Sequence, residues 1–476
     1  MEKRFYLTTA IPYVNAEPHI GFALELVQSD AVARFQRLSG KETYFLTGAD
    51  ENSLKNVQAA EKQGTSVREL VDKNTKKFID LTSALNISNN QFIRTTSAKH
   101  FAACRKLWSL CKKEDIYKKE YRGLYCVGCE TFYTEKELID GKCPEHLKEP
   151  EVVEEENYFF KLSNYQKKLE KLISGGEYEI IPGTRKNEIL SFIKMGLEDF
   201  SISRSMARAK NWGVPVPDDP EQVIYVWFDA LTNYISALDF SEDQKLYKKF
   251  WPADLHVIGK GIIRFHAVYW PAMLLSAGLP LPKKLFVHGY INIEGQKISK
   301  SLGNVINPFD LISKYGVEPV RYFLFRYIHP FQDSDFTIKH FEESYNADLA
   351  NGLGNLVNRV SNLIETNDLK IKIKPKLKFY KEVKEAMENF YFDSALKFIW
   401  QKITETDKLI NDTKPWILAK ENRTEELENV LAQAADNILS IAFNLQPFMP
   451  ESAEKIIRQF VSKKIKKERA LFPRLV

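Results

Sequence analysis

Two distant stretches of the sequence carry residue types suited to binding phosphate. The first, residues 10–22, contains Pro18, His19 and Gly21 and lies between an apolar run at 3–9 and a helical pattern at 23–38. A helix start offers unpaired N–H groups and a positive dipole end, to which His19 adds a side-chain donor. Pro18 suits a first helical turn, and Gly21 lets a ligand approach the backbone closely. By itself this stretch only suggests a phosphate site.

The second stretch, residues 295–304, contains Lys297, Ser299, Lys300 and Ser301 between glycines. Two lysines in one loop, with hydroxyls beside them, can hold a polyphosphate by charge. A solvated surface turn is the alternative, because short motifs often match by chance.

A group of cysteines and a histidine has the spacing of metal ligands. Cys126 and Cys129 form a Cys-x2-Cys pair, and Cys143 and His146 form a Cys-x2-His pair. Two close pairs of such ligands are typical of tetrahedral Zn²⁺, and four filled positions indicate a closed, structural site. A redox dithiol or a chance pattern is the alternative.

Other candidate residues follow predicted strands, where an α/β sheet binds its ligands. Asp50 comes after the strand run at 43–47, and its carboxylate could hold a substrate ammonium group or cap the next helix. Gly259 ends a strand run at 255–258 and would let ribose or adenine approach, although a lone glycine pattern is weak.

Several aromatic residues fit an ordinary core equally well. Trp227, Tyr234, His266 and Trp270 each lie on an apolar face, where core packing is the usual role. In the C-terminal part, an exposed Trp416 could stack on unpaired bases, and buried packing is the alternative.

The elements that position these residues predict an α/β fold. Strand runs alternate with helical patterns at 54–62 and 67–81, which is typical of a parallel sheet. A tyrosine-rich and charged segment follows, then a strand run at 224–227 and another α/β part, and finally helical patterns at 349–363, 381–407, 425–443 and 451–461. We therefore expect a Rossmann-like parallel sheet split by a zinc-containing insertion and followed by an α-helical bundle. The expected domains are 1–115 and 222–290 for the catalytic fold, 116–221 for the insertion, 291–345 for the lysine-loop region and 346–476 for the bundle.

Composition limits the class of protein. The 476 residues contain 68 Lys and Arg against 63 Asp and Glu, so a nucleic-acid partner is permitted but any RNA site must be local. No secretory signal or membrane-spanning run is present, which predicts a cytoplasmic protein. Five cysteines argue against a disulfide framework, and we expect Cys104 and Cys111, on an apolar helical pattern, to pack in the core.

Taken together, these stretches resemble one enzyme family. Residues 19–22 and 297–301 are similar to the HIGH and KMSKS signatures of class I aminoacyl-tRNA synthetases. Residues 45–51, 226–230, 265–272 and 414–416 resemble segments of methionyl-tRNA synthetases in the same order. The resemblance covers nearly the whole chain and indicates the bacterial type with one zinc knuckle.

The resemblance implies ATP-dependent activation of L-methionine to methionyl-adenylate and its transfer to tRNA(Met). It further implies a structural Zn²⁺, Mg²⁺ bound with ATP and no membrane partner. Because the sequence ends at Val476, without an appended dimerising module, a monomer is expected. The implied catalytic residues are His19, Lys297 and Lys300. The implied ATP-binding residues are Pro18, His19, Gly21, Gly259, Lys297, Ser299 and Lys300. The implied methionine-binding residues are Ile11, Tyr13, Asp50, Trp227, Ala230, Tyr234, His266 and Trp270. The zinc ligands are Cys126, Cys129, Cys143 and His146, and the anticodon CAU would be read by Asn355, Arg359 and Trp416.

The sequence departs from the family at a few positions that matter. Phe22 replaces the second histidine of the first signature, Asn52 and Ser53 stand where histidine and glycine are common, and Gly261 replaces an aspartate. Losing one donor to a developing charge typically lowers the rate by about 10²–10³. Two alternatives therefore stay open: a class I synthetase for another apolar amino acid, and a tRNA-binding relative with impaired catalysis.

Overall fold

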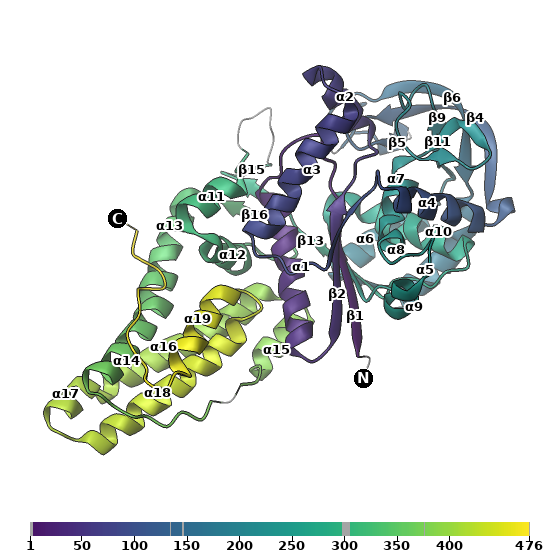
Figure 1. Cartoon of the computed structure of the whole chain (residues 1–476). Coiled ribbons are helices and arrows are strands. Elements are labelled where there is room, and N and C mark those ends of the chain that lie inside the picture. Colours follow the sequence, from purple (N-terminus) through teal and green to yellow (C-terminus); the bar gives the residue numbers. More distant parts are fainter. Residues whose placement is uncertain (1–2, 134, 145–146, 298–304, 376, 476) are drawn as a thin grey trace. The chain divides into compact units, whose positions relative to one another are not determined.

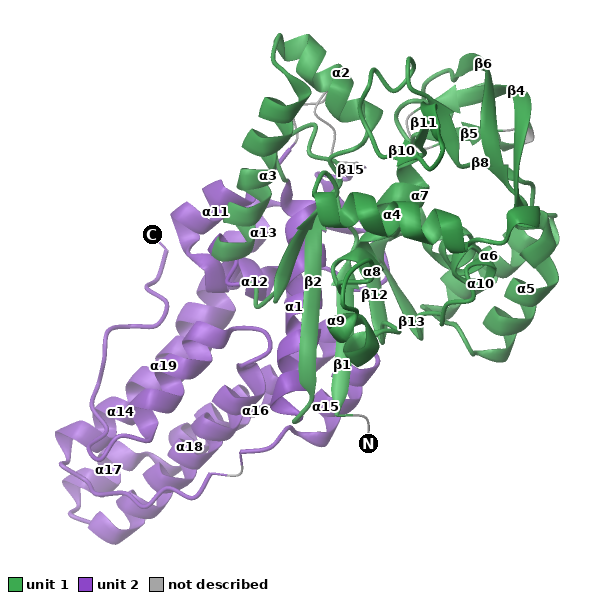
Figure 2. Cartoon of the chain, turned by 45° about the vertical axis from the view of Figure 1, so that its right-hand side comes forward, with its two compact units in different colours: residues 1–18, 40–83, 87–288 green, residues 19–39, 84–86, 289–476 purple. Residues whose placement is uncertain are grey.

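The computed structural model describes residues 3–133, 135–144, 147–297, 305–375 and 377–475 (Figure 1). The chain divides into two compact units (Figure 2). Unit 1 comprises Met1–Pro18, Gly40–Ser83 and Ile87–His288, and unit 2 comprises His19–Ser39, Ala84–Asn86 and Gly289–Val476.

A six-stranded parallel sheet forms the centre of unit 1, with strand order β3-β2-β1-β12-β13-β7. Its apolar strands are buried on both faces, as helix-covered parallel sheets require. The expected α/β class and the strands near 3–9, 43–47 and 255–258 are confirmed. The six strands are β1 (Arg4–Thr9), β2 (Glu42–Ala49), β3 (Gln91–Arg94), β7 (Glu179–Ile181), β12 (Leu255–Gly259) and β13 (Lys284–His288).

Two antiparallel sheets interrupt this fold between β3 and β12. One has the order β5-β4-β6-β8 and the other β10-β11-β9. The cysteine knuckle begins where the long strand β4 ends. Their strands are β4 (Ile116–Cys126), β5 (Thr131–Tyr133), β6 (Glu151–Phe160), β8 (Phe200–Ser201), β9 (Ser203–Ser205), β10 (Pro215–Val216) and β11 (Asp219–Ile224).

The segment between residues 116 and 221 also contributes to the parallel sheet. Strand β7 lies between the helices α5 (Gln166–Gly175) and α6 (Gly183–Lys194) and pairs in parallel with β13. The sequence predicts no strand of the parallel sheet there, because three residues are too few to show a hydrophobic period.

The predicted strand at 224–227 is wrong. Strand β11 ends at Ile224, and the helix α7 (Val226–Leu231) begins two residues later. All six residues of α7 are buried, so tertiary packing overrides the preference of valine, tryptophan and phenylalanine for strands. The helix α8 (Asn233–Ser236) follows, as expected for this region.

Unit 2 is mainly helical and contains a small sheet of β14 (Ile291–Ile293), β15 (Gln296–Lys297) and β16 (Ser334–Phe336). The expected helix at 381–407 is two helices, because Phe390 has a left-handed backbone between them (φ 62°). No helix within the described residues is long and apolar enough to cross a bilayer. The helices of unit 2 include α1 (Ile20–Leu38), α11 (Pro308–Tyr315), α12 (Val317–Arg326), α13 (Ile338–Ser344), α14 (Asn355–Thr366), α15 (Lys381–Glu388), α16 (Phe392–Thr413), α17 (Pro415–Lys420), α18 (Thr424–Leu445) and α19 (Pro450–Phe460).

A buried arginine ties together three parts of unit 2. Arg321 of α12 pairs with Asp30 of α1 at 2.7 Å, and both side chains are fully buried. The same guanidinium donates to the backbone carbonyls of Leu85 (3.0 Å) and Phe448 (2.8 Å). Removing one partner of such a pair would leave a buried charge uncompensated. This contact therefore fixes α1 against the helical part of the unit.

Candidate active site

The side chain of His19 caps the helix α1. Its Nδ1 accepts a hydrogen bond from the N–H of Gly21 at 3.1 Å, so in the neutral ring the proton lies on Nε2. A Cβ on Gly21 would lie only 3.0 Å from the His19 ring, which explains the glycine there. Pro18 precedes the cap and lies outside the helix, so the prediction that it forms part of the first turn is wrong.

The lysine loop is only partly described. The backbone of Lys297 forms β15, which pairs with β14 in an antiparallel ladder. Ser299, Lys300 and Ser301 lie outside the described residues. The expected phosphate contacts of this loop therefore stay predictions.

Asp50 follows β2 and lies beside Tyr13 in a short parallel bridge. Its carboxylate is 1% exposed and accepts the N–H of Asn52 at 3.2 Å. Burial, together with the nearby carboxylates of Asp229 and Glu130, raises the pKa of Asp50 well above its usual value. Ser53, and not Asp50, caps the next helix, α2 (Leu54–Gln63), so the alternative role of Asp50 as a helix cap is wrong.

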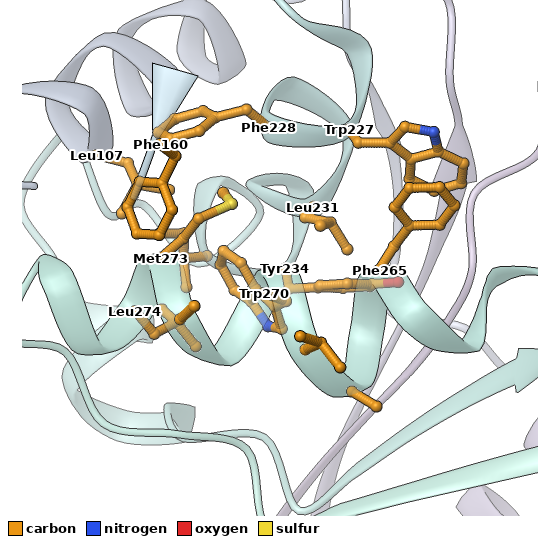
Figure 3. Packing of buried hydrophobic residues seen from close by; sticks show 14 of the residues in the cluster. Leu107, Phe160, Trp227, Phe228, Leu231, Tyr234, Phe265, Trp270, Met273 and Leu274 are labelled. Atoms are coloured by element: carbon orange, nitrogen blue, oxygen red, sulfur yellow. The ribbon is translucent and has the colours of Figure 1, made fainter. Parts of the chain in front are cut away.

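An aromatic stack forms one wall of the expected methionine pocket. The rings of Trp227 and Phe265 lie face to face, 3.6 Å apart and nearly parallel (Figure 3). The ring of Tyr13 meets Trp227 edge-on at 6.4 Å. The indole N–H of Trp227 donates to the carbonyl of Cys129 at 3.4 Å, which links this wall to the cysteine knuckle.

His266 lies in a π-helical segment, η5 (Phe265–Tyr269), and both of its ring nitrogens have protein partners. Its Nδ1 donates to the carbonyl of Ile262 at 3.0 Å, and its Nε2 accepts from the hydroxyl of Tyr234 at 2.7 Å. Burial lowers the pKa of His266 to about 4, so the ring is neutral at pH 7. The hydroxyl of Tyr13, in contrast, is buried without a hydrogen-bond partner among the described residues.

The structure brings together most of the expected methionine-binding residues in unit 1. Ile11 and Tyr13 pack against the cluster that contains the other aromatic members, and Ala230 is also buried. Tyr234 and Trp270 lie close together within this cluster (Figure 3). The cluster consists of apolar and aromatic groups with few polar atoms, which suits a thioether side chain.

The cysteine knuckle brings three sulfur atoms to one point. The Sγ atoms of Cys126, Cys129 and Cys143 lie within 4.8 Å of one another, and those of Cys129 and Cys143 are 3.2 Å apart. None of the three forms a disulfide within the part of the chain that the structure describes. Three converging sulfurs fit a thiophilic ion such as Zn²⁺. His146, the expected fourth ligand, lies outside the described residues.

A cavity of about 540 Å³ lies beside the knuckle. Its lining includes Cys129, Tyr225, Lys260 and Phe265 but none of the eight residues expected to bind methionine. The cavity is therefore separate from the expected side-chain pocket, although Phe265 borders both. Gly259 ends β12 immediately before this lining.

In unit 2, the expected anticodon residues form a partly exposed group. The guanidinium of Arg359 lies 6.0 Å from the ring of Trp416, which is 38% exposed. Arg359 also donates to Asp407 at 2.6 Å, which fixes its orientation. Asn355 is exposed one turn earlier on the same helix, α14. Exposure of Trp416 excludes the alternative of buried packing.

Several residues at the site were missing from the sequence-based assignment. Phe265 stacks on Trp227, Asn52 donates to Asp229 at 2.7 Å, and Glu130 accepts from Ser53 at 2.6 Å. The only feature of the sequence that could have pointed to Phe265 is that it immediately precedes His266. No pattern could pair Glu130 with Ser53, because the contact joins residues far apart in the chain.

The core positions of Cys104 and Cys111 were predicted and are confirmed.

Comparison with known proteins identifies the family of this chain. The family model for class I tRNA synthetases (M) matches residues 5–149 and 145–361. Methionine–tRNA ligases of Thermotoga maritima and Brucella suis are each 43% identical over 96% of this chain, which spans 75% and 91% of their lengths. A solved Mycobacterium tuberculosis methionyl-tRNA synthetase in complex with methionyl-adenylate is 40% identical, with a TM-score of 0.91 over 96% of this chain and 94% of that one. The chain therefore belongs to the methionyl-tRNA synthetase family of class I tRNA synthetases.

Proposed function

We propose that this chain is a methionine–tRNA ligase, which activates L-methionine with ATP and transfers it to tRNA(Met). The observation that carries the proposal is its similarity, over nearly its whole length, to relatives named methionine–tRNA ligase and to a solved structure that holds methionyl-adenylate. The aromatic cluster around Trp227 and Tyr234 supports it, because such a surface suits a thioether.

In this proposal, Asp50 binds the ammonium group of methionine. A buried carboxylate with a raised pKa gains from a cationic ligand, which stabilises its ionised form. The side chain of methionine would contact Ile11, Tyr13, Trp227, Ala230, Tyr234, His266 and Trp270. The directed contact would come from the hydroxyl of Tyr13, since both nitrogens of His266 already have protein partners.

His19, Lys297 and Lys300 are the groups proposed to stabilise the phosphates of ATP. The methionine carboxylate would attack the α-phosphate, so no protein nucleophile is needed and catalysis depends on positioning and charge. With Nδ1 used as the cap acceptor, His19 would offer its Nε2–H to phosphate. Pro18, Gly21, Gly259 and Ser299 would complete the ATP site.

The later transfer step needs tRNA, and the cysteine knuckle needs its metal. Asn355, Arg359 and Trp416 would read the anticodon, with Trp416 stacking on an unpaired base. Cys126, Cys129, Cys143 and His146 would bind one structural Zn²⁺. The five domain boundaries, Mg²⁺ on the phosphates and the monomeric state stay predictions.

Methionine-dependent exchange of pyrophosphate into ATP tests the activation step. We expect exchange with methionine and none with leucine, isoleucine or valine. Exchange with another apolar amino acid, and none with methionine, would favour the alternative of a class I synthetase for that amino acid. Because Phe22 cannot donate a hydrogen bond, the variant Phe22→His is measured in parallel. No exchange in the natural chain, restored by Phe22→His, would identify a tRNA-binding relative that has lost activation.

A further inference from the structure

Glu130 is a buried glutamate that has no role in the function proposed above. It follows Cys129 in the knuckle, is 0% exposed and has a left-handed backbone (φ 50°), which is uncommon for a residue with a side chain. Its Oε1 accepts from the hydroxyl of Ser53 at 2.6 Å and from the N–H of Lys55 at 3.1 Å. Its Oε2 is buried without a hydrogen-bond partner among the described residues.

Glu130 contacts the segment that follows Asp50, beside the proposed amino-acid site. After burial, Glu130 is the strongest influence that raises the pKa of Tyr13, and it also raises the pKa of Asp50. The ammonium group of Lys55 lies 4.8 Å from the centre of the Tyr13 ring. Through Ser53 and Lys55, Glu130 therefore contacts the residues three and five positions after Asp50, and the side chain of Lys55 reaches the Tyr13 ring.

The knuckle holds Glu130 in this position through its backbone. The carbonyl of Glu130 accepts a hydrogen bond from the hydroxyl of Tyr225, and the preceding carbonyl, of Cys129, accepts from Trp227 at 3.4 Å. Ser53, which is both the cap of α2 and the donor to Glu130, is one of the departures noted in the sequence. The cysteine knuckle, the aromatic wall and the start of α2 are thus joined through one dipeptide.

We propose that Glu130 is a positioning residue for the amino-acid substrate: its carboxylate, held by Ser53 and by the N–H of Lys55, adds negative charge close to the segment of Asp50 and strengthens binding of the substrate ammonium group. The inference rests on the proposed function, in which Asp50 binds that ammonium. It assigns the knuckle a role in substrate affinity in addition to folding. Glu130 itself acts through Tyr13 and Asp50.

The test compares Glu130→Gln with the natural chain in methionine-dependent exchange. Inhibition is measured with L-methioninol, which has the ammonium group, and with 4-(methylthio)butan-1-ol, which is the same uncharged skeleton without it. We expect the KM for methionine and the inhibition constant of methioninol to rise about 10-fold, because one buried charge interaction is lost. The KM for ATP, the inhibition constant of the ammonium-free compound and the zinc content should not change.

A matched control removes a carboxylate elsewhere in the same insertion. Glu156 lies on β6 and pairs with Lys118 at 3.2 Å, with both side chains exposed to solvent, so Glu156→Gln should leave all these constants unchanged. An unchanged methioninol constant in Glu130→Gln would overturn the inference. An equal rise for the ammonium-free compound would also overturn it, because that result indicates general distortion of the pocket.

A second variant decides the matter if Glu130→Gln folds poorly or loses zinc. Ser53→Ala removes the hydroxyl donor and leaves the charge, and we expect about a 3-fold rise in the methioninol constant alone. No rise in this variant would then overturn the inference. Absence of methionine-dependent exchange in the natural chain would instead overturn the proposed function, and this inference with it.

Discussion

The hydroxyl of Tyr234 donates a hydrogen bond to Nε2 of His266 across 2.7 Å, while Nδ1 of the same ring donates to the carbonyl of Ile262. These two bonds fix both the tautomer and the orientation of the imidazole. The side of the proposed methionine pocket that His266 would form is thereby prepared before any ligand binds, and no reorganisation of the ring is needed.

Tyr234→Phe should therefore destabilise the fold and weaken methionine binding. The substitution leaves Nε2 of His266 buried without a donor, which costs about 1–3 kcal/mol in the free energy of unfolding. Urea denaturation measures this cost, and exchange kinetics measure the KM for methionine. Identical stability and KM in the variant would show that the bond has no role in the pocket.

Stability should fall as the pH is lowered, and His266 should account for part of the change. Its pKa is about 4 in the folded state and near 6.5 when unfolded, so the unfolded chain binds the extra proton first. Its contribution to stability is complete above pH 6.5 and is lost between pH 6.5 and 4, by about 3 kcal/mol in total. His256, whose pKa burial also lowers, adds to the same trend.

Urea denaturation between pH 7 and pH 4.5 measures this dependence. The variant His266→Gln, which cannot take up the proton, should show a shallower fall in the free energy of unfolding. Equal slopes for the two proteins would contradict the assignment to His266.

Asp50→Asn should raise the KM for methionine on the order of 100-fold, since it removes one partner of a buried charge pair. The KM for ATP should change much less. Exchange kinetics at varied methionine and ATP separate the two effects, and a similar loss for both substrates would argue against an ammonium site at Asp50.

Removing the metal should damage both the knuckle and the methionine pocket. The natural chain should contain one equivalent of zinc, and Cys143→Ser should lose it, unfold more readily and bind methionine less tightly. Cys111→Ser, which changes a buried cysteine outside the triad, is the matched control and should keep its zinc. A metal-free chain that stays folded and active would refute a structural zinc site.

Trp416→Ala should weaken tRNA charging and leave methionine-dependent exchange intact, because the anticodon takes part only in tRNA charging. Removing one base-stacking ring typically costs about 1–3 kcal/mol. Ile417, equally exposed at 38% and next in sequence, provides the control Ile417→Ala. An equal loss of charging and exchange in Trp416→Ala would remove this residue from anticodon recognition.

The sequence allowed prediction of those features whose signal is local. The alternation of strands and helices around β1 and β2 predicted the parallel sheet, and the Cys-x2-Cys and Cys-x2-His spacings together predicted the three sulfurs that converge. The helix at 226–231 was missed, because its aromatic and β-branched residues favour a strand and only burial in the fold reverses that preference.

Contacts between distant residues could not be predicted. The bond between Ser53 and Glu130 and the stack of Trp227 on Phe265 depend on how the insertion folds back onto the parallel sheet. Strand β7 was missed for a related reason, since its pairing with β13 is determined by tertiary structure rather than by its own three residues.

Charging of a CAU-anticodon tRNA transcript by the purified natural chain, with labelled methionine and ATP, tests the proposed function most directly. We expect labelled methionine on the transcript only when ATP is present, and no label from leucine or isoleucine. Charging with a different amino acid, or no charging by a folded chain that retains its metal, would contradict a methionine–tRNA ligase.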